Sequence, residues 1–150
     1  MEVFRISSEA YARTLSSSGS ANRWNAKGQY VLYAGSSRSL STLELVVHKG
    51  AVKPVVPYKV MVISIADDDY LTKQIHLKDL PANWRSLAAY AVLQTIGSEW
   101  YSARESLVLK VPSAVIPLEY NYMINTEHPE FPHKVRLVRT EDYFWDERLL

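Results

Sequence analysis

An arginine and a glutamate within the stretch from Asn22 to Glu44 are the residues best suited to chemistry on an anionic ligand. Glu44 follows Leu40 by four positions and precedes Val47 by three. In a helix this spacing puts it on the apolar face or at its edge. A buried carboxylate without a partner is costly. Glu44 therefore needs a partner, and Arg23 is the candidate from the same stretch.

The Arg23–Glu44 pair has two interpretations. It could be a structural ion pair that braces a loop on a helix, since such pairs also form away from functional sites. It could instead be a site, because an arginine binds phosphate through two hydrogen bonds and a carboxylate near a sugar carbon stabilises a developing oxocarbenium ion. The spacing alone leaves both open.

Two tyrosines lie in the apolar run between these charged residues. Tyr30 and Tyr33 are three positions apart, so in a strand they face opposite sides of the sheet, and Tyr33 is nearer the following serine-rich turn. Aromatic residues at such positions are most often part of the core. The functional alternative for Tyr33 is a ring that stacks on a base or a nicotinamide, with the hydroxyl holding the ligand.

Other catalytic devices are absent from the sequence. Ser113 follows Pro112 at the end of an expected strand, but there is no G-x-S-x-G motif around it. Walker A and G-x-G-x-x-G patterns are missing. The histidines show no metal-ligand spacing, so no metal is expected; they are His48, His76, His128 and His133.

Length and composition predict one globular domain over residues 1–150, with 47% hydrophobic and 22% charged residues. The net charge of +1 argues against a nucleic-acid partner. The lack of cysteine excludes disulfides and thiol catalysis. The N-terminus has no secretion-signal pattern, and no apolar run approaches the roughly 20 residues that span a bilayer. We therefore expect a soluble cytoplasmic protein without membrane contact.

Hydrophobic patterning predicts an α+β fold, because the elements do not alternate as in a parallel sheet. A serine-rich loop is expected over residues 7–28. A helix capped by Ser36 or Ser37 should run to about His48, and a second should run from Trp84 to Ala103, with a possible break at Gly97. Extended segments are expected at Val3–Ile6, Gln29–Ala34, Val55–Ala66, Ile75–Leu77, Leu107–Val111, Val115–Pro117, Tyr120–Asn125 and Val135–Arg139.

Five pieces of the sequence, in order and spacing, resemble the RES family, toxins of bacterial toxin–antitoxin pairs named for an Arg, a Glu and a Ser. The pieces are F-R-I, R-W-N-A-K-G-Q-Y-V-L-Y-A-G-S-S, S-T-L-E-L-V-V-H, V-P-S-A-V-I-P and N-Y-M-I-N-T-E-H-P-E-F. They carry Arg5, Arg23, Tyr33, Glu44, Ser113, Asn121, Asn125, His128 and Pro129. One departure is Ala21-Asn22, where a glycine commonly precedes the R-W pair.

The resemblance implies a fold like the ADP-ribosyltransferases, with a split, antiparallel or mixed sheet. It also implies cleavage of the nicotinamide–ribose bond of NAD⁺ by hydrolysis or phosphorolysis. NAD⁺ would be the substrate, with phosphate as co-substrate in the case of phosphorolysis, and no cofactor is expected. An Xre-type antitoxin is the implied partner, covering the active site, and a homodimer within that complex is one arrangement. The alternatives are ADP-ribose transfer to a protein and a non-catalytic binding module; an RNase is a third that the charge disfavours.

These implications give each residue an expected role. Arg23 and Arg5 would bind phosphates or the incoming anion, and Tyr33 would stack on the nicotinamide–ribose end. Glu44 would hydrogen-bond a ribose hydroxyl and stabilise the cation. Ser113 would hold the substrate or orient Glu44, and Asn121 would bind substrate. Arg23 and Glu44 would then share one cleft without touching.

Overall fold

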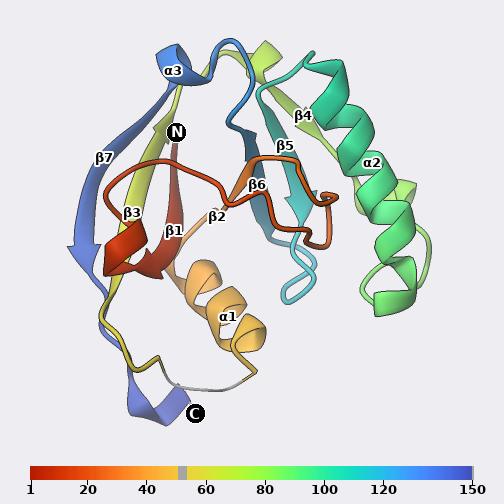
Figure 1. Cartoon of the computed structure of the whole chain (residues 1–150). Coiled ribbons are helices and arrows are strands. Elements are labelled where there is room, and N and C mark those ends of the chain that lie inside the picture. The colour runs from red at the N-terminus through yellow and green to blue at the C-terminus, as the bar shows by residue number, and fades with distance from the viewer. Residues whose placement is uncertain (51–53, 150) are drawn as a thin grey trace.

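The computed structural model describes residues 1–50 and 54–149 and contains one seven-stranded mixed sheet of order β4-β5-β6-β2-β1-β3-β7 (Figure 1). Only β4 and β5 are parallel; the other neighbours in the described sheet are antiparallel. The strands are β1 (Glu2–Ser8), β2 (Val31–Gly35), β3 (Tyr58–Ile65), β4 (Thr72–Gln74), β5 (Val108–Pro112), β6 (Tyr120–Asn125) and β7 (Val135–Asp142). The α-helices are α1 (Arg38–His48), α2 (Tyr90–Ala103) and the short α3 (Phe131–Lys134). The expected α+β class is confirmed.

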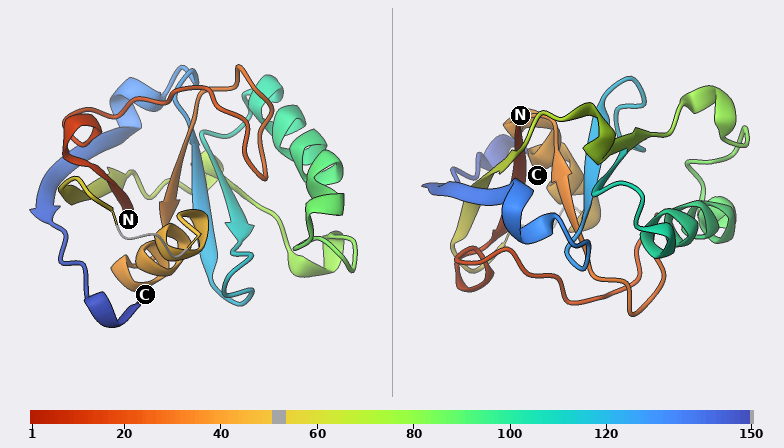
Figure 2. Two further views of the ribbon diagram at one scale, coloured as in Figure 1. Left: turned by 60° about the horizontal axis from the view of Figure 1, so that its bottom comes forward. Right: turned by 90° about the horizontal axis from the view of Figure 1, so that it is seen from above.

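The sheet splits between β1 and β2. β1 pairs with β3 along its whole length, whereas β1 and β2 share the single pair Phe4–Gly35. The strands therefore diverge on either side of this point, into the halves β4-β5-β6-β2 and β1-β3-β7 (Figure 2). The expected split sheet is confirmed, and the divergence leaves space beside the junction for a site.

Helix α1 packs on β1 and β2 at this junction. The Ser37 hydroxyl caps the helix by accepting from the Leu40 N–H at 3.0 Å. The Ser41 hydroxyl donates to the Phe4 carbonyl oxygen at 2.9 Å. A Cβ on Gly35 would lie 2.5 Å from Ser41 Oγ, so Gly35 permits this close approach.

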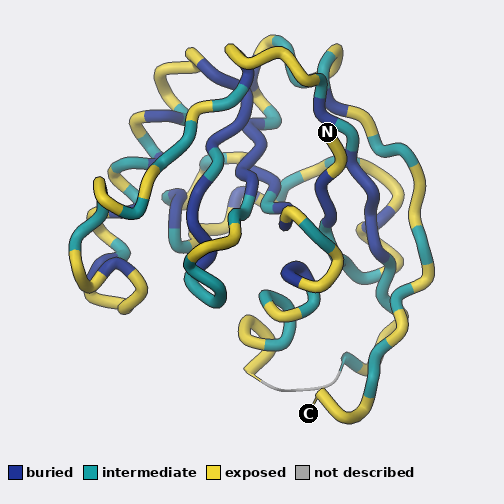
Figure 3. The backbone as a smooth tube through the Cα atoms, turned by 180° about the vertical axis from the view of Figure 1, so that it is seen from behind, coloured by how far each residue is buried: buried dark blue, intermediate teal, exposed yellow. Residues whose placement is uncertain are grey.

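Buried residues lie along the strands of the sheet and in the first turn of α1 (Figure 3). One core lies between the two half-sheets, with Leu32, Met61, Ile63 and Ile124 at its centre. A second core joins α2 to β5 and β6 through Leu93, Trp100, Leu109 and Met123, and it includes Trp24 and Trp84. No helix within the described ranges is long and apolar enough to cross a membrane.

Four expectations about local structure are wrong. The strand expected at Ile75–Leu77 lies earlier, at Thr72–Gln74, and Leu77–Asp79 forms a 3₁₀ turn. Helix α2 begins at Tyr90 rather than Trp84, and it continues through Gly97. Residues 114–118 form bends and turns in place of the expected extended segment. On α1, Leu43 and Val47 are 37% and 61% exposed, so the expected buried stripe is limited to its first turns.

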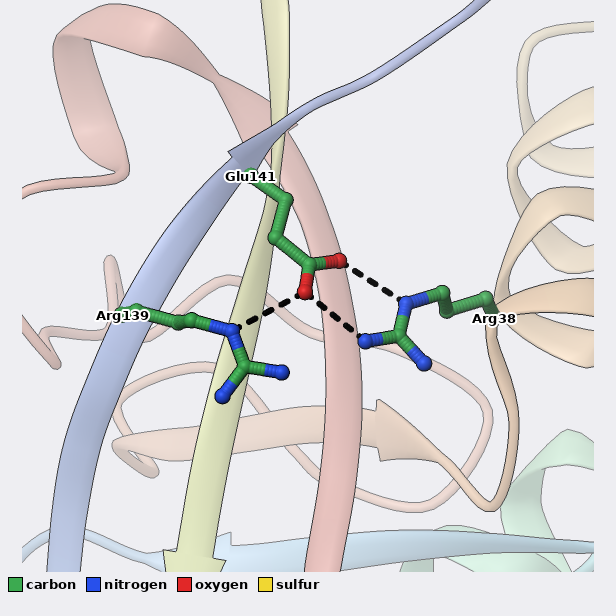
Figure 4. Close-up of polar contacts among 3 residues, drawn as sticks. All are labelled: Arg38, Arg139 and Glu141. Carbon is green, nitrogen blue, oxygen red and sulfur yellow. Dashed lines mark hydrogen bonds and ion pairs between the residues drawn. The ribbon is translucent and has the colours of Figure 1, made fainter.

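An ion-pair cluster ties the start of α1 to the edge strand β7. The guanidinium of Arg38 donates two hydrogen bonds of 2.8 Å to the Glu141 carboxylate, and Arg139 donates a third of 3.0 Å (Figure 4). The Arg38 hydrogen bond, with Arg139 assisting, lowers the pKa of Glu141 from 4.5 to about 2. The cluster holds α1 against the three-stranded half-sheet.

Replacing Glu141 with glutamine is expected to lower the melting temperature by only about 1–3 °C at pH 7, the scale of a surface pair. Folding lowers the pKa of Glu141. Its contribution to the free energy of unfolding is therefore complete above about pH 4.5 and is lost as the pH falls towards 2. The melting curves of the two proteins should therefore converge between these pH values. A difference that persists at pH 2 would contradict this origin.

Candidate active site

A pocket of about 690 Å³ lies beside the split in the sheet. Its walls come from β1, β2, α1, residues 22–24, residues 85–90 and the connection between β5 and β6. The volume is within the range of small-molecule sites, about 300–1,000 Å³. The pocket brings together five of the expected site residues, Arg5, Arg23, Tyr33, Glu44 and Asn121. The sixth, Ser113, is completely buried behind Glu44.

Glu44 is held by two donors on one oxygen of its carboxylate. The Ser113 hydroxyl and the Asn121 side-chain amide both donate to Oε1, each at 2.7 Å. Oε2 has no hydrogen-bond partner among residues 1–50 and 54–149, and Glu44 is half-buried at the pocket wall. The carboxylate is therefore fixed in orientation, with one oxygen left for a ligand.

The ion pair between Arg23 and Glu44 does not form. Neither Arg23 nor Arg5 lies within 4.0 Å of the Glu44 carboxylate in the described structure. The structural interpretation of the pair is therefore wrong. Glu44 is partly buried because it lines a pocket, and Arg23 lines the same pocket. This arrangement was expected for two charged groups that share a cleft without touching.

Ser113 points its proton at Glu44. Its oxygen accepts hydrogen bonds from the backbone N–H groups of Val115 and Ile116, both at 3.0 Å. A hydroxyl has two acceptor lone pairs and one proton, so the proton is left for Glu44 Oε1. Of the two roles expected for Ser113, this geometry favours orienting Glu44 over holding substrate.

Arg23 connects two loops at the pocket wall. Its Nη1 donates to the carbonyl oxygens of Trp84 and Arg85, at 3.3 and 3.0 Å. Its guanidinium lies 4.8 Å from the centre of the Tyr90 ring. These contacts use Nη1 and one face of the guanidinium group. The other N–H groups of Arg23 are left for an anion.

Arg5 brings a half-buried positive charge to the pocket from β1. Its Nη1 donates to the Tyr33 carbonyl oxygen at 3.1 Å, and no carboxylate of the described chain pairs with it. Burial lowers the pKa of Arg5, although an arginine remains charged at neutral pH. Partial burial of a cation without a carboxylate partner is unfavourable, and an anion in the pocket would compensate it.

Tyr33 lines the pocket, whereas Tyr30 is 42% exposed outside it. The Tyr33 hydroxyl donates to Oδ1 of Asn25 at 2.5 Å. Burial raises the pKa of Tyr33, so it stays protonated at neutral pH. The expectation that this hydroxyl holds the ligand is not supported, because its proton is already bonded.

Sequence reasoning missed Arg85, Tyr90 and the role of Asn25. Arg85 lines the pocket, and its Nε donates to the Ala114 carbonyl oxygen at 2.8 Å. Arg85 and Tyr90 fell within a segment expected to be a regular helix, so nothing marked them. Asn25 follows Arg23-Trp24 directly, and its position in that motif was the available signal.

Asn125 and His128, which the family resemblance also included, support the backbone away from the pocket. Asn125 Nδ2 donates to the Tyr101 carbonyl at 3.2 Å. His128 Nδ1 accepts from the Glu130 N–H at 3.1 Å, so its Nε2–H donates to the Arg104 carbonyl oxygen at 3.0 Å. Among the described residues there is no group of three or more His, Asp or Glu side chains that could hold a metal ion.

Three curated relatives are toxins by name. The chain is 35% identical over 153 residues to "Toxin Res" of Yersinia enterocolitica, covering 99% of both chains. It is 32% identical over 152 residues to "Toxin Res" of Pseudomonas putida, again covering 99% of both. It is 32% identical over 130 residues to the "Prs ADP-ribosylating toxin" of a Sphingobium species, covering 85% of this chain and 80% of that one.

A solved structure shares the fold. The crystal structure of the Mycobacterium tuberculosis MbcT–MbcA toxin–antitoxin complex matches 95% of this chain and 83% of its own matched chain, with a TM-score of 0.76 and 16% identity. With the ADP-ribosylating relative, this likeness confirms the expected ADP-ribosyltransferase-like fold. The model of the RES domain matches residues 2–146. The chain therefore belongs to the RES family.

Proposed function

We propose that this chain is a toxin that cleaves the nicotinamide–ribose bond of NAD⁺. The observation that carries the proposal is the Glu44 carboxylate, fixed by Ser113 and Asn121 through one oxygen while the other is left for a ligand. It lies in a pocket that also contains Arg5 and Arg23. One oriented negative charge and two positive charges suit a substrate with a developing cation and a pyrophosphate.

The chemical step requires stabilisation of a cationic sugar. When the bond between the ribose carbon C1″ and the nicotinamide nitrogen breaks, its electron pair goes to the ring nitrogen. Nicotinamide then leaves as a neutral molecule. The ribose is left as an oxocarbenium-like centre. Glu44 Oε2 accepts a hydrogen bond from a ribose hydroxyl and places negative charge beside this centre, and such preorganised electrostatics are often the largest catalytic contribution. Water or phosphate then adds at the same ribose carbon. Water releases one proton to solvent when it adds.

The arginines bind the other half of the substrate. Arg23 has N–H groups that do not take part in its two carbonyl contacts. Arg5 is half-buried and has no carboxylate partner in the described chain. Guanidinium groups form paired hydrogen bonds with phosphate oxygens. Binding a pyrophosphate would neutralise both charges and hold the ribose against Glu44, with Tyr33 stacked on the nicotinamide end.

The test is incubation of the purified chain with NAD⁺, with and without inorganic phosphate, followed by mass analysis of the products. Release of nicotinamide is expected. ADP-ribose as co-product indicates hydrolysis, and ADP-ribose 1″-phosphate formed faster with added phosphate indicates phosphorolysis. If no nicotinamide is released under either condition, the proposal is wrong, and a non-catalytic binding module becomes the better account.

A second candidate is transfer of ADP-ribose to a protein, which the name of the Sphingobium relative favours. The same Glu44 and the same leaving group would serve, with a protein side chain as the acceptor. Labelled NAD⁺ added to a cell lysate should then mark a target protein, and little free ADP-ribose should form. The absence of a labelled band together with stoichiometric free ADP-ribose would exclude this candidate.

An antitoxin partner is part of the proposal. The MbcT relative was solved as a toxin–antitoxin complex, and RES toxins resemble this chain over nearly its full length. We propose that an Xre-type antitoxin covers the mouth of the pocket. Co-expression of such a partner should restore growth and block NAD⁺ loss, and growth restored without a block of NAD⁺ loss would contradict pocket coverage.

Replacing Ser113 with alanine is expected to lower kcat about 10–100-fold with little change in KM, because one hydrogen bond to a charged group that orients Glu44 is lost. The matched control is Ser102→Ala on the exposed face of α2, which should keep wild-type rates. A rise in KM with unchanged kcat would instead show that Ser113 binds substrate.

A further inference from the structure

The orientation of the Asn25 side chain is fixed by its surroundings. Asn25 is 2% exposed, and its Nδ2 lies within hydrogen-bond distance of the carbonyl oxygens of Ser20, Ala26 and Gln29, at 2.9, 3.1 and 3.4 Å. Carbonyl oxygens only accept hydrogen bonds, so the nitrogen of the amide must face them. Oδ1 therefore points the other way, towards Tyr33.

This orientation determines the direction of the hydrogen bond between the two side chains. Asn25 Oδ1 can only accept, so the Tyr33 hydroxyl must be the donor. Its single proton is then turned away from any ligand in the pocket. Tyr33 lines the pocket, so its ring is the part left for contact with substrate.

Asn25 also closes the loop that carries Arg23. The backbones of Asn22 and Asn25 are bonded to each other by N–H···O contacts of 3.0 and 3.4 Å, with Arg23 and Trp24 between them. The Asn25 side chain thus connects this loop, through one bond, to a residue of β2. The bond therefore couples the position of the Arg23 loop to the orientation of the Tyr33 side chain.

We propose that Asn25 is a positioning residue that holds the Arg23 loop and the Tyr33 ring as one unit, and that Tyr33 acts on substrate through its ring rather than as a proton donor. This inference rests on the proposed NAD⁺ reaction for its kinetic readout. Its structural content, the direction of the Asn25–Tyr33 bond and its effect on the ring, can be measured without substrate.

The kinetic experiment is a double-mutant cycle with Tyr33→Phe and Asn25→Ala. Tyr33→Phe keeps the ring and should cost about 10-fold or less in kcat, whereas Tyr33→Ala should cost more than Tyr33→Phe. The double variant should be no slower than Asn25→Ala alone, because both changes remove the same bond. Two outcomes would overturn the proposal, because each gives the Tyr33 hydroxyl an independent role. One is a loss in kcat of the double variant that equals the product of the two single losses. The other is a 100-fold loss of kcat in Tyr33→Phe when Asn25→Ala remains active.

The substrate-free experiment is NMR of protein carrying ¹³Cζ-labelled tyrosine, with the Tyr33 signal assigned through Tyr33→Phe. Asn25→Ala should shift this signal, while the Tyr11 signal, from a tyrosine that is 74% exposed, should stay in place. An unshifted Tyr33 signal would overturn the coupling. If the wild-type protein leaves NAD⁺ intact while the Asn25→Ala variant shows the shift, the proposed function is refuted and the Asn25–Tyr33 unit is retained.

Discussion

Replacing Glu44 with glutamine is expected to lower the rate of NAD⁺ cleavage at least ~10²-fold, the scale for one preorganised electrostatic group. Glutamine has the same shape, and its side-chain oxygen can still accept from Ser113 and Asn121 where Glu44 Oε1 accepts now. The group facing the ligand then becomes an NH₂ donor in place of a negatively charged acceptor. The change therefore tests the charge at the ribose without disturbing its supports.

The Glu44→Gln measurement is nicotinamide release at saturating NAD⁺, with melting temperature as the test of folding. Glu99→Gln, on an exposed position of α2, is the matched control and should keep the wild-type rate. Unchanged turnover in Glu44→Gln would remove Glu44 from the mechanism. A lost rate accompanied by a collapsed melting curve would assign Glu44 a structural role instead.

The sequence predicted which residues meet at the pocket better than it predicted how they are paired. Arg23, Tyr33 and Glu44 were marked by their types and by the family resemblance. Of the two interpretations of Arg23 and Glu44, the ion pair does not form; proximity in sequence was the only reason to consider it. Orienting Glu44 was one of the two roles expected for Ser113. The actual donors, Ser113 and Asn121, come from the end of β5 and from β6. Their approach depends on the register that pairs Gly35 with Asn121, which composition and periodicity do not specify.

The elements with strong apolar runs were predicted close to their observed positions. Residues 84–89 were wrongly predicted to be α-helical, because the helical spacing of apolar residues continued into them. Trp84 is buried there against Trp24, with ring centres 6.5 Å apart, and this tertiary contact holds a turn in place of a helix. The same segment supplies the carbonyl groups that hold Arg23. The error therefore fell on a part of the chain that builds the site.

At Gly97 the prediction of a helix break is wrong, and the reason for the glycine is a close contact with another part of the chain. Alanine is favoured over glycine in a helix interior by about 1 kcal/mol, and the sequence suggested a break in α2. The helix is continuous, and a Cβ on Gly97 would lie 1.5 Å from the carbonyl oxygen of Trp24. The glycine thus admits the backbone of the Arg23–Trp24 loop directly against the helix.

Gly97→Ala is therefore expected to destabilise the protein, against its helix propensity. An overpacked contact costs about 1–3 kcal/mol, which corresponds to a melting temperature lower by roughly 2–12 °C in a chain of this size. The larger effect should be on activity. The loop must move to admit the methyl group, and a misplacement of about 1 Å can cost ~10² in rate.

Thr95→Ala is the matched control, since Thr95 is exposed on the same helix and its replacement raises helix propensity. It should be as active as the wild type and at least as stable. If Gly97→Ala were also more stable and fully active, the contact with Trp24 would not position Arg23. If it were folded but less active, with a raised KM for NAD⁺, the loss would lie in the Arg23 loop and not in Glu44, whose supports come from β5 and β6.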